Sequence, residues 1–77
     1  MTAEQLRNAR DAVPFRPFSI RMADGRAFRV IHRDYISISP SGRTVVVYLN
    51  DEAFNVLDLL LMTELSVDPV PASSGAA

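Results

Sequence analysis

The 77-residue chain has no cysteine, no lysine and no tryptophan, and it has a single histidine. The lack of cysteine excludes disulfides, thiol catalysis and cysteine-based metal sites. The three glycines stand far apart, which excludes a phosphate-binding loop or a dinucleotide-binding fingerprint. The longest near-apolar stretch, Val56 to Met62, is far short of the roughly 20 residues that a membrane span needs. No secretory signal pattern opens the chain, so we expect a cytoplasmic protein.

The sequence offers little for catalysis. His32, Asp34 and Ser37 supply the residue types of a triad. A strand would point the side chains of residues 32 and 34 the same way, and no strained turn presents the serine. Two candidate ligands, His32 and Asp34, are too few for a zinc site. We therefore expect no enzyme activity, no metal and no cofactor.

Charge is distributed unevenly along the chain. Residues 1–43 hold all eight arginines against four carboxylates, a net charge of +4. Residues 44–77 hold five carboxylates and no cation, and the whole chain carries −1. The two halves would neutralise each other if they interleave in the fold. A basic half is also what a phosphate-binding surface requires, so nucleic acid remains a second partner class.

Residues 2–13 have the pattern of a short amphipathic helix. Thr2 and Gln5 have the spacing of a capping box. Leu6, Ala9 and Val13 form one apolar stripe. Pro14 ends the helix, because the residue before a proline is pushed out of the helical region.

From Phe18 onward the apolar residues alternate, which predicts strands joined by tight turns. A three-residue loop at 23–25, with Gly25 in the left-handed conformation, places Ile20 opposite Phe28 on one face. The same register places Arg21 and Arg29 together on the outer face. In the next hairpin, a two-residue loop at 41–42 sets strand 35–39 against strand 44–49, so that Tyr35 lies opposite Tyr48.

Residues 53–67 allow two interpretations. Phe54, Leu57 and Leu61 have helical spacing. Alternatively, Phe54 and Val56 alternate as a strand, 58–61 form a tight turn, and a last strand covers 63–67. We favour the strand interpretation because it completes a barrel from the preceding strands. One domain then spans residues 1–68, and we expect the Pro-, Ala-, Ser- and Gly-rich residues 69–77 to be a disordered tail.

Three segments resemble a family of small bacterial proteins to which no activity is attached. They are Pro14–Ile20, with its "PFRPF" motif, Ala23–His32, with its "DGR" motif, and Leu57–Leu65. More distantly, a helix followed by five short strands resembles the Sm-like and SH3-like small barrels. That resemblance implies ring-forming oligomers that bind single-stranded RNA, but the recognition motifs of Sm-like chains are missing here. The predicted fold is thus mainly β: an N-terminal helix and a five-stranded, strongly bent antiparallel sheet or small barrel.

With no catalytic constellation in a short, apolar-rich chain of near-zero net charge, we expect a non-catalytic interaction or assembly module. Its partner is a protein or a second copy, met through edge strands. The alternative is single-stranded RNA binding, for which Arg21, Arg29, Tyr35 and Tyr48 are the candidate residues. No membrane association is expected.

Overall fold

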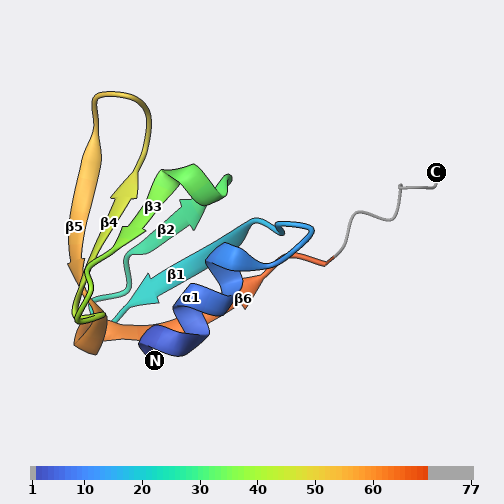
Figure 1. Cartoon of the computed structure of the whole chain (residues 1–77). Coiled ribbons are helices and arrows are strands. Elements are labelled where there is room, and N and C mark those ends of the chain that lie inside the picture. Colours follow the sequence, from blue (N-terminus) through green and yellow to red (C-terminus); the bar gives the residue numbers. More distant parts are fainter. Residues whose placement is uncertain (1, 70–77) are drawn as a thin grey trace.

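The computed structural model describes residues 2–69, which form one helix and six strands (Figure 1). Two three-stranded antiparallel sheets are present, with the strand orders β2-β1-β6 and β3-β4-β5. In chain order the elements are α1 (Ala3–Asp11), β1 (Phe18–Met22), β2 (Ala27–Val30), the 3₁₀ turn η1 (Arg33–Tyr35), β3 (Ile36–Ile38), β4 (Thr44–Tyr48), β5 (Phe54–Asp58), the 3₁₀ turn η2 (Leu59–Leu61) and β6 (Met62–Val67). The predicted tail, 69–77, lies outside the described residues except for Pro69.

The start of α1 is confirmed, but its predicted end is wrong. The Thr2 side chain accepts the Gln5 N–H at 3.1 Å, and the Gln5 side chain accepts the Thr2 N–H at 3.0 Å. Leu6 is fully buried. The chain leaves the helical conformation at Ala12, whose ψ is 143°. Val13 therefore falls outside the apolar stripe and is 86% exposed.

The first hairpin has the predicted register. Ile20 lies opposite Phe28, and Phe18 opposite Val30. The loop spans residues 23–25, and Gly25 has a φ of +93°. Because opposed residues share a face, this register buries Ile20 and Phe28 together in the core.

The second hairpin also has the predicted register, but it begins later. Ile36 lies opposite Val47 and Ile38 opposite Val45. Tyr35, predicted as a strand residue, lies instead in η1. The reason is local: the His32 side chain accepts the Asp34 N–H at 3.2 Å and so caps a 3₁₀ turn.

Residues 53–67 follow the strand interpretation, as β5, η2 and β6. Six strands are present within residues 2–69, where the sequence predicted five. The predicted single bent sheet is replaced by two sheets, which do not close into a hydrogen-bonded barrel within residues 2–69. The chain passes from one sheet to the other twice, through residues 31–35 and through η2.

One apolar core lies between the two sheets, and α1 contributes Leu6 to it. The helix lies along β6 and reaches the β3–β4 turn (Figure 1). There the Arg7 guanidinium donates to the carbonyl of Pro40 at 3.2 Å. The buried apolar side chains are Leu6, Phe18, Ile20, Met22, Phe28, Val30, Ile36, Val45, Val47, Leu57, Leu59 and Met62.

The contact between α1 and the β3–β4 turn can be tested at Gly42, whose φ is +81°. A Cβ at Gly42 would lie 2.6 Å from the Cβ of Ala3, whereas a Cβ at Gly25 would meet nothing within 4 Å. Gly25→Ala should cost roughly 1–2 kcal/mol for the left-handed backbone alone. Gly42→Ala should cost at least about 1 kcal/mol more, because the helix must shift. Urea denaturation of both variants measures the difference, and equal losses would contradict the contact.

Candidate interaction surface

The outer face of the β4–β5 hairpin is apolar and exposed. Tyr48 lies opposite Phe54, and Val46 opposite Val56. The Tyr48 and Phe54 rings pack with centroids 5.8 Å apart. Phe54 is 58% and Val56 61% exposed. We call Val46, Tyr48, Phe54 and Val56 the β4–β5 face; Val46 is half-buried and the other three residues are exposed. Contiguous exposed apolar residues mark an interaction site more often than scattered ones do.

Strand β5 is also a free edge, since among the strands of residues 2–69 only β4 lies next to it. Hydrogen bonds at the two ends of the pair join the Leu49 N–H to the Ala53 carbonyl and the Leu59 N–H to the Arg43 carbonyl. Antiparallel ladders alternate every two residues, so Asn55 and Leu57 bond to β4 between these ends. The backbone N–H and C=O groups of Phe54, Val56 and Asp58 consequently point away from the sheet, where no strand of residues 2–69 meets them.

The other strand edges carry features that discourage pairing. β6 carries the charged Glu64, and α1 lies along it, with Gln5 and Leu65 lining the same hollow. β2 carries Arg29, and β3 is only three residues long. β5 has no proline, no bulge and no charge before Asp58. It is thus the least protected edge among the described strands.

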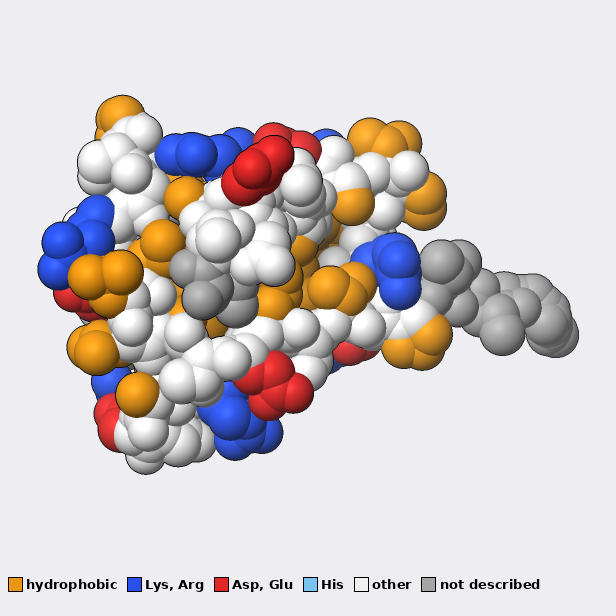
Figure 2. All heavy atoms as spheres, turned by 90° about the horizontal axis from the view of Figure 1, so that it is seen from below, with side chains coloured by type: hydrophobic (Ala, Val, Ile, Leu, Met, Phe, Trp, Pro, Cys, Tyr) orange, Lys and Arg blue, Asp and Glu red, His pale blue; other side chains and the backbone are white. Residues whose placement is uncertain are grey.

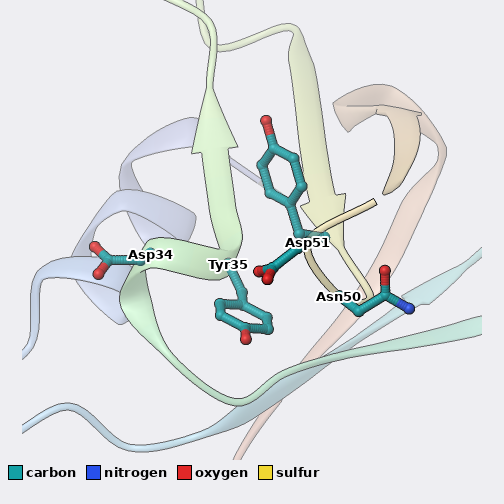
Figure 3. Close-up of a pocket in the computed structure, with 5 residues that line it drawn as sticks. Asp34, Tyr35, Asn50 and Asp51 are labelled. Carbon is teal, nitrogen blue, oxygen red and sulfur yellow. The ribbon is translucent and has the colours of Figure 1, made fainter. Parts of the chain in front are cut away.

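A shallow hollow of about 280 Å³ lies at the end of the β3–β4 pair, lined by Asp34, Tyr35, Tyr48, Asn50 and Asp51. Figure 3 shows the Asp51 carboxylate turned toward Tyr35, whereas the Asp34 carboxylate is turned away from it. The aromatic rings and the carboxylate give this hollow the chemistry for a cation. The residues supply no nucleophile activated by a base.

The predicted pair of Tyr35 and Tyr48 is not formed. The two residues line the same hollow, but the Tyr48 ring packs on Phe54 and the Tyr35 ring lies 6.3 Å from that of His32. The physical reason is the capped 3₁₀ turn, which takes Tyr35 out of the strand that would have held it opposite Tyr48.

Arg21 and Arg29 lie on the outer face of the β2-β1-β6 sheet, as expected, and each is paired there. Arg21 donates to Glu64 at 3.1 Å. Arg29 forms a two-bond ion pair with Asp68 and also donates to Ser19. The structure therefore places these arginines on one sheet and Tyr35 and Tyr48 at an end of the other.

The remaining arginines are also engaged within the chain. Arg10, Arg26 and Arg43 pair with Asp11, Asp24 and Asp58, respectively. Arg7, Arg16 and Arg33 donate to backbone carbonyls. Figure 2 shows the result on one face, where basic and acidic side chains alternate in small groups. The basic first half is thus neutralised in part by carboxylates of the second half, Asp58, Glu64 and Asp68.

Within residues 2–69 no group of three or more histidine, aspartate or glutamate side chains is arranged to hold a metal ion. His32 is exposed, and its ring nitrogen caps η1. No helix of this part of the chain has the length and apolarity needed to cross a membrane.

The sequence reasoning did not identify Phe54 and Val56 as surface residues. Their exposure could have been predicted, because directly opposed residues of two antiparallel strands lie on the same face of the sheet, as in the other two hairpins. Val45 faces the core, and a three-residue loop at 50–52 places Leu57 opposite Val45. Leu57 then points inward, and Phe54 and Val56 must point outward.

The ion pair of Arg43 with Asp58 predicts part of the acid sensitivity of the fold. The pKa of Asp58 lies below its usual value, because Arg43 and the Leu60 N–H both donate to its carboxylate. As the pH falls through the ordinary aspartate pKa, the unfolded state takes up the proton first and stability declines. Asp58→Asn keeps an oxygen that can accept the Leu60 N–H, but it has no carboxylate to titrate. The variant therefore lacks the pH-dependent stability that the ionised Asp58 provides. Its urea midpoint should fall less steeply than that of the wild type between about pH 5 and pH 3; parallel curves would contradict the pairing.

The pairing of the arginines also predicts weak contact with nucleic acid. Phosphates would have to displace carboxylates that already bind Arg21 and Arg29. A labelled single-stranded oligonucleotide should therefore show no mobility shift with the full chain at low salt, where phosphate binding is strongest. The double variant Glu64→Gln, Asp68→Asn frees both arginines and serves as the positive comparison. A salt-sensitive shift with the wild type would overturn this expectation.

Comparison of the chain with protein-family models, with curated proteins and with solved structures finds no match. The resemblances to the small bacterial family and to Sm-like barrels stay predictions. The function must therefore be argued from the β4–β5 face, the β5 edge and the charges around them.

Proposed function

We propose that the chain is a non-catalytic protein-interaction module that accepts an extended strand of its partner along β5. The single observation that carries the proposal is the coincidence of a free strand edge with exposed apolar side chains on the same strand. The outward backbone groups of Phe54 and Val56 would supply hydrogen bonds. Their side chains, exposed beside Tyr48 and Val46, would supply apolar area.

This role is supported over nucleic-acid binding by the state of the charges. Every arginine already has a carboxylate or a carbonyl partner, and the chain has no lysine. The carboxylates of Asp51 and Glu52, next to the β4–β5 face, would repel a phosphate backbone. A protein strand, in contrast, needs hydrogen-bonding groups and apolar side chains, which β5 offers.

The order of the strands supports a small SH3- or Sm-like barrel as the framework of this module. β2 and β3 follow each other in the chain and lie in different sheets, separated only by residues 31–35. If they are the two halves of one bent strand interrupted by η1, the six strands correspond to the five of such a barrel. The short turn η2 would then be the one-turn break before the last strand.

A displayed library of random dodecapeptides, screened against the full chain at low concentration, tests the proposal. We expect enrichment of peptides with alternating β-branched or aromatic residues, because these form strands. Val56→Pro removes an outward N–H without removing a bond to β4. It should weaken binding of the enriched peptides by about tenfold or more, because one hydrogen bond to the peptide is lost and the proline ring keeps the peptide backbone away from β5.

The matched control is Val13→Ser, which removes an exposed valine elsewhere on the surface. It should leave peptide binding unchanged, whereas Phe54→Ser should weaken it. Enriched peptides that bind Val56→Pro as well as they bind the wild type would refute the β5 site.

A further inference from the structure

We infer that the strand paired with β5 is β5 of a second copy of this chain, so that a two-fold axis passes beside Val56 and joins two β3-β4-β5 sheets into one. This inference rests on the proposed function of β5 as a pairing edge. It goes further by naming the partner and the register of the pair.

The outward groups of β5 are self-complementary. Antiparallel pairing about Val56 sets Val56 opposite Val56 of the second copy and Phe54 opposite Asp58 of the second copy. All three residues are outward-pointing, so each pair is of the hydrogen-bonded kind and every outward N–H and C=O finds a partner. A two-fold contact of this kind uses the same patch twice and closes at two chains.

The charges disfavour the neighbouring register centred on Asn55. A shift by one residue, with the axis beside Asn55, would place Asp58 opposite Glu52 of the second copy, which sets like charges together. With the axis beside Val56, Glu52 falls opposite Leu60 of the second copy, an exposed apolar residue. Asp58, the only charge on the strand, is balanced by its own Arg43. The acidic tips of the two β4–β5 loops then lie at opposite ends of the dimer.

The charge state of the whole chain is compatible with self-association. The net charge of −1 gives little repulsion between two copies. Pairing β5 with β6 of the next copy, which would build an open or closed ring, is less favourable. The edge of β6 has α1 alongside it and carries Glu64.

Sedimentation equilibrium of the full chain across a wide concentration range tests the state of assembly. The mass should rise from that of one chain, 8.5 kDa, to twice that value and no further. Val56→Pro should stay at one chain mass over the same range. Val56→Thr, which keeps the N–H and the β-branched shape, is the matched control and should still pair. Circular dichroism of each variant establishes that it is folded.

Hydrogen exchange of the wild type tests, without any substitution, whether the outer edge of β5 forms the contact. The amides of Phe54 and Val56 should exchange slowly at high concentration and quickly at low concentration. The amides of Asn55 and Leu57 bond to β4 within one chain, so their exchange should change far less. This contrast between alternate residues would not arise from general compaction.

Three results would overturn the inference. They are a monomer at the highest concentration, a mass above two chains, and a dimer in which Phe54 and Val56 exchange as fast as in the monomer. If the chain stays monomeric while enriched peptides still lose affinity for Val56→Pro, then β5 pairs with a foreign strand. That result would support the proposed function and would contradict only the inference that the partner is a second copy.

Discussion

The structure depends on burial of one face of every strand in a single core. No strand of one sheet is hydrogen-bonded to a strand of the other within residues 2–69, so side-chain packing must hold the two sheets together. Because side chains alternate along a strand, a slip of one residue would expose the whole inward set. This constraint fixes the registers of the three hairpins β1–β2, β3–β4 and β4–β5, and Leu6 extends the same core to the helix. The residues between the buried positions of each strand form the outer faces of the two sheets, and the core does not restrict their type.

Those remaining residues differ sharply between the two sheets. The outer face of β2-β1-β6 is charged, and its arginines are paired with carboxylates from the end of the chain. The outer face of β4–β5 is apolar, and the outer edge of β5 meets no strand within residues 2–69. Every cation of the chain is an arginine, of which five pair with carboxylates and three donate to backbone carbonyls.

Much of this arrangement could be predicted from the sequence, because strand alternation and turn residues are local signals. The registers at Ile20 with Phe28 and at Ile36 with Val47 followed from placing apolar residues on one face. The position of Tyr35 could not be predicted in this way, since it depends on a hydrogen bond from a backbone amide to His32. The partners of Arg21 and Arg29 depend on how β6 returns to β1, which is a long-range event that no local pattern encodes.

The exposed edge of β5 is unfavourable for an isolated chain, because its backbone groups can pair with any other strand. Small β-proteins blunt such edges with lysine, proline or bulges, and this chain uses none of them at residues 54–57. A helix lies along β6, charges protect β2, and β3 is only three residues long, so β5 is the one long edge among the described strands without such protection. An edge left open beside exposed Phe54 and Val56 would favour aggregation if it had no defined occupant. In the pairing that we propose, a second copy would be that occupant, and the two-fold axis would end the assembly at two chains, because no further β5 edge would be left to extend.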